Sequence, residues 1–167
     1  SLPLANFKKY LLQDYKFLIQ FARAYGLGVY KAETLEDMRH CMGIASAILD
    51  TEIELHVRLC REWGLSDEVL ENTPEVFETI AYTRFVLEAG LSGDALDLHT
   101  ALSPCIIGYA EIANFIVNDS RTVIVGNPYR SWIEEYASAE YQAVANNAKN
   151  YIDNLAHKRL TEGRFPG

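Results

Sequence analysis

Apolar residues recur at helical spacing along almost the whole chain. In the first part they fall at positions i, i+3, i+4 and i+7, in the series Phe7, Tyr10, Leu11, Phe17, Leu18, Phe21 and Tyr25. This spacing is typical of an amphipathic helix, because 3.6 residues per turn bring such positions onto one face. Similar stripes predict further helices over about 34–63, 74–90, 92–117, 127–136 and 138–160. Only Thr122–Val125 favours an extended conformation, so we expect an all-α, single-domain helical bundle over residues 1–167.

Local signals mark where several of these helices begin and end. Thr34 stands before an acidic first turn, as an N-terminal cap does, and Gly64 supplies a stop signal. The pair Asn127–Pro128 predicts an N-cap followed by proline at the first helical position. Ser138 predicts the cap of the last helix.

Charge and composition exclude some classes of function. The 167 residues include 15 Lys and Arg against 23 Asp and Glu, which gives a net charge of −8. Nucleic-acid binding relies on a basic surface that neutralises phosphates, so we expect no nucleic-acid partner. We also expect no signal peptide, and no apolar stretch long enough to span a bilayer, hence no membrane partner. The three cysteines lack metal-like spacing and suit a reducing, cytoplasmic compartment.

Cys105 is the first candidate for chemistry. It follows Pro104 inside the apolar helical run 101–112, where a proline removes one backbone hydrogen bond and disturbs the helix. Tyr109 lies four residues later, on the same helical face. A thiol beside a phenol could act as a nucleophile, but a cysteine in an apolar run can also be a small buried hydrophobe. Both interpretations stay open on this pattern alone.

Asp14 is the second candidate, because it falls inside the apolar stripe of the first helix. A buried carboxylate is costly unless it is paired or functional. A structural alternative pairs it with an arginine such as Arg23 or Arg84. Glu52 and His56 also share a core-facing stripe, and we interpret them as a hydrogen-bonded structural pair. The chain has no Glu-x-x-His motif, so no metal site is predicted.

Tyrosines supply the remaining candidates. Tyr82, Tyr109 and Tyr136 take apolar-facing positions on three different predicted helices. Most aromatic residues at such positions only fill a core. A cysteine that attacks a flat heteroaromatic ring would nevertheless need aromatic walls, an orienting hydroxyl and a carboxylate for the ring nitrogens. The chain offers all three kinds of group.

Several segments together resemble the TenA family, also called thiaminase II or aminopyrimidine aminohydrolase. The resemblance runs in order through almost the whole chain, in segments 1–7, 10–15, 49–64, 81–84, 101–112 and 127–136. It implies a haem-oxygenase-like helical fold without haem or another cofactor, assembled as a homotetramer. It also implies hydrolysis of 4-amino-5-aminomethyl-2-methylpyrimidine to the hydroxymethyl pyrimidine in thiamin salvage, and cleavage of thiamin itself by many members.

The resemblance also implies roles for single residues. Cys105 matches the family nucleophile, Asp14 the acid that hydrogen-bonds the aminopyrimidine edge, and Tyr109 the tyrosine that orients the thiol. Tyr82 and Tyr136 match tyrosines that line the substrate pocket. Phe17 stands where many members carry a tyrosine, which keeps a stacking surface but removes a hydroxyl contact.

The ends of the chain depart from the family pattern. Members carry a further helix before and after this segment, and the last helix brings a catalytic glutamate. Glu162 is no convincing match for that glutamate. The alternative hypotheses are a non-catalytic pyrimidine- or thiamin-binding protein, a regulatory protein of the same fold, and a metal- or haem-dependent enzyme.

Overall fold

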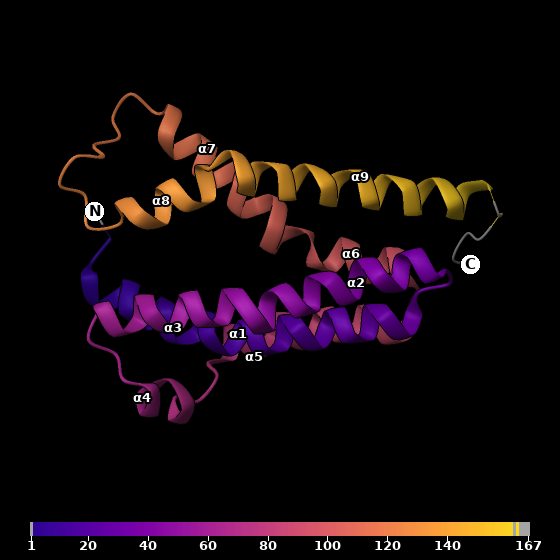
Figure 1. Cartoon of the computed structure of the whole chain (residues 1–167), viewed down its shortest axis with the longest axis horizontal. Helices are drawn as coiled ribbons and strands as arrows, with labels where there is room; N and C mark the ends of the chain where they lie inside the picture. The colour runs from indigo at the N-terminus through magenta and orange to yellow at the C-terminus, as the bar shows by residue number, and fades with distance from the viewer. Residues whose placement is uncertain (1, 162, 164–167) are drawn as a thin grey trace. The chain divides into compact units, whose positions relative to one another are not determined.

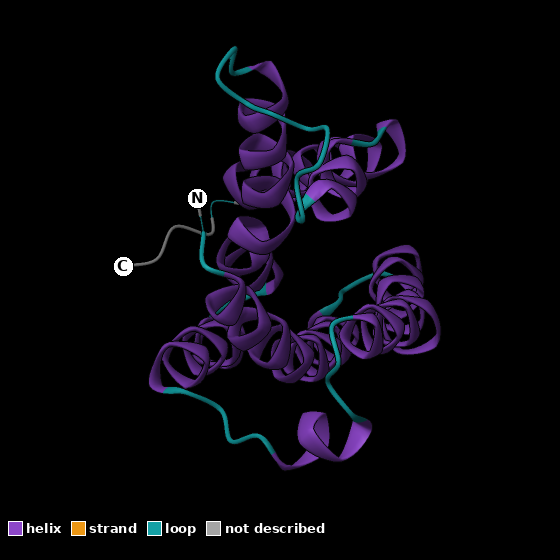
Figure 2. Ribbon diagram, turned by 90° about the vertical axis from the view of Figure 1, so that its left-hand side faces the viewer, coloured by secondary structure: helices purple, strands orange, loops and turns teal. Residues whose placement is uncertain are grey.

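The computed structural model describes residues 2–161 and residue 163. Figure 2 shows this part of the chain as helices and loops alone, which confirms the all-α prediction. Thr122–Val125, where we expected an extended segment, lies in a loop and forms no strand. Contacts between residues divide the chain into two compact units, residues 1–98 and 99–167. The expectation of one domain over the whole chain stays a prediction.

The first unit is built around one long helix. Helix α1 (Leu4–Lys31) packs against α2 (Leu35–Ala47), α3 (Ile53–Glu62) and α5 (Phe77–Ser92), and Figure 1 shows these helices lying lengthwise beside one another. The predicted stripe of α1 is its buried face, where the exposed fraction is 8% or less for Phe7, Leu11, Leu18, Phe21 and Tyr25. The apolar period of the sequence therefore locates the core of this unit.

A π-helical turn explains why Glu52 does not share the core-facing stripe with His56, as we had predicted. Residues Ile48–Glu52 form this turn, η1, between α2 and α3, and the amide of Ile53 donates to the carbonyl of Ile48, five residues back. The extra residue rotates every later side chain relative to a 3.6-residue repeat. As a result His56 and Cys60 are buried on α3, whereas Leu49 and Glu52 are exposed.

Three helix ends follow their predicted signals. The Thr34 hydroxyl accepts a hydrogen bond from the Asp37 amide at 3.1 Å and caps α2. Gly64, with φ of 75°, ends α3 in a Schellman motif, where the Leu65 amide donates to the Cys60 carbonyl. The Ser138 hydroxyl caps α9 by accepting from the Tyr141 amide at 3.1 Å. The six-residue helix α4 (Asp67–Asn72) was not predicted, because it is too short to show a stripe.

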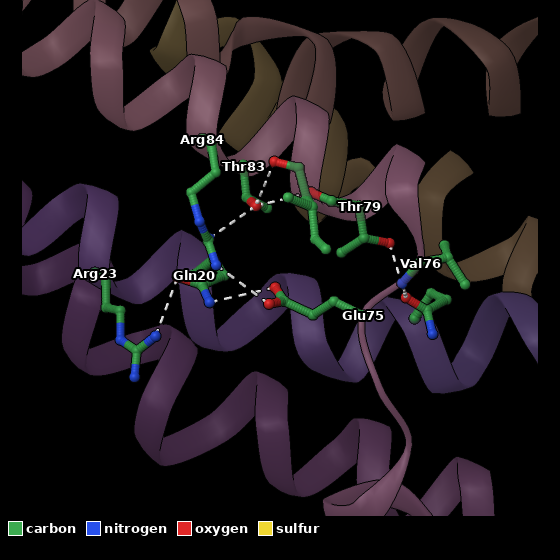
Figure 3. Close-up of polar contacts among 9 residues, drawn as sticks. Gln20, Arg23, Glu75, Val76, Thr79, Thr83 and Arg84 are labelled. Atoms are coloured by element: carbon green, nitrogen blue, oxygen red, sulfur yellow. Dashed lines mark hydrogen bonds and ion pairs between the residues drawn. The ribbon is translucent and has the colours of Figure 1, made fainter.

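A seam of polar contacts fastens the start of α5 to α1. The Gln13 side chain of α1 accepts hydrogen bonds from the Val76 amide and the Thr79 hydroxyl, both at 2.9 Å, and donates to the Pro74 carbonyl at 3.0 Å. About two turns after Gln13 on α1, the Gln20 side chain donates a hydrogen bond to the Glu75 carboxylate. The Arg84 guanidinium of α5 donates to the same carboxylate, as Figure 3 shows. Side chains of α1 thus fix the position of α5.

The second unit contains the helices that follow Leu98. It begins within α6 (Ala95–Ser103) and continues through a π-helical turn, η2 (Pro104–Gly108), into α7 (Tyr109–Asn118). Helices α8 (Arg130–Ala137) and α9 (Ala139–Thr161) complete it, and both pack on α7. We predicted α8 to begin at Asn127–Pro128, but it begins at Arg130. The Asn127 side chain instead accepts from the Tyr129 amide in a turn, so it does not cap the helix.

We expected no apolar stretch long enough to span a bilayer, and one helix contradicts this expectation by its length and apolar composition. The continuous helix Ala95–Asn118 contains an 18-residue window whose mean hydropathy is 1.4. Of this window, 22% is buried inside the structure. Its length and apolar composition are sufficient to cross a bilayer. We had predicted a helix over about 92–117 that includes Pro104, but we did not count its apolar residues as a possible span. A core helix of a soluble protein meets the same criterion, so the evidence for a membrane span is weak.

Candidate functional site

Asp14 projects from the middle of the core face of α1 and is largely buried. Its side chain is 12% exposed, and its Oδ2 accepts a hydrogen bond from the Tyr10 hydroxyl at 3.3 Å. Burial raises the pKa of the Asp14 carboxyl above its ordinary value, while the nearby His56 and the Tyr10 hydrogen bond lower this pKa by less. A buried acid with a perturbed pKa is a candidate for function.

His56 of α3 is the principal partner of Asp14. Its Nδ1 lies 3.5 Å from Asp14 Oδ2, and its Nε2 lies 2.8 Å from the Leu11 carbonyl oxygen. Our pairing of His56 with Glu52 is therefore wrong, because η1 turns Glu52 to the surface. The proposed arginine partners of Asp14 are also wrong, since Arg23 binds Gln20 and Arg84 binds Glu75 and Thr83.

Phe17 and Tyr82 form an aromatic wall next to this acid. Phe17 lies one turn after Asp14 on α1, and its ring stacks on that of Tyr82 of α5 with centroids 6.1 Å apart and planes 27° apart. Phe17 also stacks on Phe21 at 5.1 Å. The first unit thus brings together three of the predicted site residues, Asp14, Phe17 and Tyr82.

Cys105 lies in the π-helical turn η2, directly after Pro104. Proline has no amide hydrogen, so it cannot donate to the Thr100 carbonyl four residues back. The Ser103 hydroxyl donates to that carbonyl instead, at 2.8 Å. The Cys105 carbonyl oxygen accepts from the Tyr141 hydroxyl of α9 at 3.3 Å. These contacts support an irregular turn of the kind that often marks functional sites.

The second unit gathers the other predicted residues around an aromatic cluster. The ring of Tyr109, on α7, lies 4.9 Å from the ring of Tyr136 on α8. Tyr136 also contacts Trp132 and Tyr141, each at 4.7 Å between centroids. Sequence reasoning gave no role to Tyr141. The signal that could have identified it is its position three residues after the Ser138 cap, which directs it toward the preceding helices.

The other two cysteines have different surroundings. Cys41 and Cys60 are 1% and 0% exposed, whereas Cys105 is partly exposed. Burial raises the pKa of Cys41 to about 11, with a contribution from the charge of Asp37. Burial raises the pKa of Cys60 to about 11 as well, with a contribution from Asp14. Both therefore stay protonated near neutral pH, where a thiolate is needed for attack.

Two further observations bear on the predicted site. Glu162, weighed above as the catalytic glutamate, lies outside the residues that the structure describes. Within residues 2–161 and 163, no three His, Cys, Asp or Glu side chains lie together as a metal site would need.

The fold and these two clusters define an all-helical protein with a buried acid, a cysteine in an irregular turn and aromatic walls. The chain belongs to the TENA/THI-4/PQQC family, whose model matches residues 1–162. This membership confirms the resemblance seen in the sequence.

Individual relatives and a solved structure agree with the family. A protein of Haemophilus influenzae without a known function is 39% identical over 93% of this chain and 71% of its own length. The aminopyrimidine aminohydrolase of Halalkalibacterium halodurans is 33% identical over 93% of this chain and 69% of its own. The crystal structure of a TenA family transcription regulator from Silicibacter sp. TM1040 covers 95% of this chain and 69% of that one, with 42% identity and a TM-score of 0.88.

Proposed function

We propose that this protein is an aminopyrimidine aminohydrolase of thiamin salvage. It hydrolyses 4-amino-5-aminomethyl-2-methylpyrimidine: water replaces the amine on the methylene carbon, and one ammonia leaves for each hydroxymethyl pyrimidine formed. The observation that carries the proposal is the relative of that name, which matches 93% of this chain. Thiamin, which bears the same pyrimidine unit, is the second substrate that we propose.

Asp14 holds the aminopyrimidine edge of the substrate in this proposal. A carboxyl group that is 12% exposed offers a strong hydrogen-bond acceptor where little water competes. The stacked pair Phe17 and Tyr82 provides a flat apolar surface for the ring. Tyr136, within its aromatic cluster, lines the same substrate in our proposal.

Cys105 supplies covalent catalysis, with Tyr109 orienting its thiol. The thiolate adds to a ring carbon, so a carbon–sulfur bond forms and the ring takes up a proton. The ring electrons then expel the amine, which leaves protonated, and an exocyclic methylene remains. Water adds to this carbon and loses a proton. The thiolate then departs, and the ring releases the proton that it took up and regains its aromaticity. General acid–base catalysis of the proton transfers contributes roughly two to four orders of magnitude in rate, and the family resemblance implies a glutamate for that task.

Ammonia release from the aminomethyl pyrimidine tests this proposal. Cys105→Ser replaces the thiolate by a poor nucleophile, and we expect its turnover to fall to background while its circular dichroism stays unchanged. Cys41→Ala is the matched control, because it removes a buried thiol to which we assign no role in the chemistry, and it should retain turnover. Full activity in Cys105→Ser would rule out the nucleophile.

We also propose a homotetramer in the cytoplasm, following the family resemblance. Several large apolar side chains are exposed on the single chain, among them Phe77, Phe85 and Phe115, which are 79%, 61% and 68% exposed. Apolar surface of this kind is common where subunits meet. Light scattering should give four chain masses, and a monomer at micromolar concentration would contradict the assembly.

A regulatory role is the second candidate, because the Silicibacter relative is described as a transcription regulator. The net charge of −8 weighs against direct contact with DNA. A gel-shift that strengthens as the salt concentration falls would support this candidate over the hydrolase.

A further inference from the structure

The Leu11 carbonyl determines which nitrogen of His56 carries a proton. A carbonyl oxygen can only accept a hydrogen bond, and it lies 2.8 Å from His56 Nε2. Nε2 must therefore donate, so this nitrogen is protonated whether the ring is neutral or cationic. The His56 side chain is 9% exposed, which leaves little access for water to compete with this contact.

The other ring nitrogen then faces the carboxyl of Asp14. Nδ1 lies 3.5 Å from Asp14 Oδ2, long for a hydrogen bond but close for two groups that are both largely buried. With Nε2 protonated, a neutral ring turns the Nδ1 lone pair toward the carboxyl. An ionised Asp14 would then oppose that lone pair, and a buried charge would lack its counterion. One proton shared by the pair removes both penalties.

We propose that His56 is a positioning residue that shares one proton with Asp14 and leaves Asp14 Oδ1 to accept a hydrogen bond from the substrate amino group. This inference rests on the proposed function, in which Asp14 binds the aminopyrimidine. The proton lies either on Nδ1, beside a carboxylate, or on Oδ2, beside a neutral ring. The pair is electrically neutral in both cases, which suits a buried site that binds a neutral pyrimidine.

The contacts of Asp14 agree with this division between its two oxygens. His56 and the Tyr10 hydroxyl both approach Oδ2, and no contact described for this carboxyl uses Oδ1. The titratable groups that act on Asp14 are Tyr10 of α1 and His56 of α3, and Cys60 of α3 feels its charge. Arg84 of α5, an arginine that we had considered as a partner of Asp14, is paired with Glu75.

Nuclear magnetic resonance on the full-length wild type tests the shared proton without any substitution. We expect His56 Nε2 to be protonated at pH 7, together with one of two patterns: a protonated Nδ1 with an ionised Asp14, or a bare Nδ1 with a protonated Asp14. A neutral ring protonated on Nδ1, or a bare Nδ1 beside an ionised Asp14, would overturn the inference.

Kinetics test the positioning role. His56→Gln places an amide donor near the Leu11 carbonyl but has nothing at the position of Nδ1. We expect KM for the aminomethyl pyrimidine to rise by about tenfold, the usual effect of a disturbed hydrogen bond to a charged or buried group, with a smaller change in kcat. His99→Gln is the matched control, because His99 is also a buried histidine, packed edge to face against Tyr151 of α9. The KM of this variant should stay within about twofold.

The two hypotheses fail in different ways. An unchanged KM in His56→Gln overturns the positioning role even if the wild type releases ammonia. A wild type that releases no ammonia rejects the proposed function and with it the substrate contact of Oδ1. In that case the resonances of His56 and Asp14 still decide whether the pair shares a proton.

Discussion

The three cysteines of the chain differ in what surrounds them. Cys41 and Cys60 sit in the core, and burial raises the pKa of each to about 11. Cys105 lies in a π-helical turn with partial exposure. Thiolate reactivity depends on ionisation and access together, so the local environment separates a nucleophile candidate from two structural residues that sequence alone cannot tell apart.

Alkylation distinguishes these cysteines directly. With iodoacetamide at pH 7.5, well below the pKa of about 11 of the two buried thiols, we expect Cys105 to be modified first. Mass spectrometry of tryptic peptides would show one labelled site at early times. Equal labelling of Cys60 in the native protein would contradict this account of burial, and labelling in urea provides the positive control.

The titration of Asp14 is a second test at the residue scale. Burial raises the pKa of its carboxyl, so this group should still hold its proton at a pH where an exposed aspartate, with a pKa of 3.8, is ionised. Tyr10→Phe removes a hydrogen bond that favours the ionised form, and it should raise the midpoint further. The carboxyl carbon resonance reports both midpoints. A lower midpoint in Tyr10→Phe would show that the hydroxyl does not donate to Asp14.

At the scale of single elements, residues of α1 do more than fill a core. Helix α5 has no capping side chain of its own, since Val76 occupies the N-cap. Gln13 provides the missing acceptor from α1, and Lys16 donates to the Glu71 carbonyl near the end of α4 at 2.7 Å. Phe17 lies on the same face as these two residues and stacks on Tyr82. Caps from another helix thus align the aromatic wall.

Removing this cap should weaken α5. Gln13→Ala leaves the Val76 amide and the Pro74 carbonyl without this partner, and we expect a loss of about 0.5–2 kcal/mol in the free energy of unfolding. Gln13→Glu keeps the acceptor and should lose less. Urea denaturation measures both variants, and hydrogen exchange should quicken in the first turn of α5. Equal stability of wild type and Gln13→Ala would show that the Gln13 contacts contribute nothing.

Helix positions were predictable from the sequence where apolar residues recur regularly, and they were not predictable where an added residue interrupts this repeat. The stripe of α1 and the caps at Thr34, Gly64 and Ser138 were all found from sequence. The two π-helical turns were not, because a 3.6-residue repeat contains no signal for an added residue. The turn at Ile48–Glu52 is the reason why we assigned Glu52 to the core.

At the scale of the whole molecule, family membership covers both compact units. The family model spans residues 1–162, and the Silicibacter structure matches 95% of the chain with a TM-score of 0.88. The inward position of Asp14 was predictable from its place in the stripe. Its partner His56 was not, because it lies more than forty residues away on α3, and contacts between helices leave no trace in the spacing of a single sequence.

Hydrolysis of the aminopyrimidine is the central claim, and isotope labelling tests it most directly. The purified chain would be incubated with 4-amino-5-aminomethyl-2-methylpyrimidine in ¹⁸O-labelled water, and the product and ammonia would be quantified together. The account predicts one ¹⁸O atom in each hydroxymethyl pyrimidine and one ammonia for each molecule of product. Binding of the pyrimidine with neither labelled product nor ammonia would contradict it.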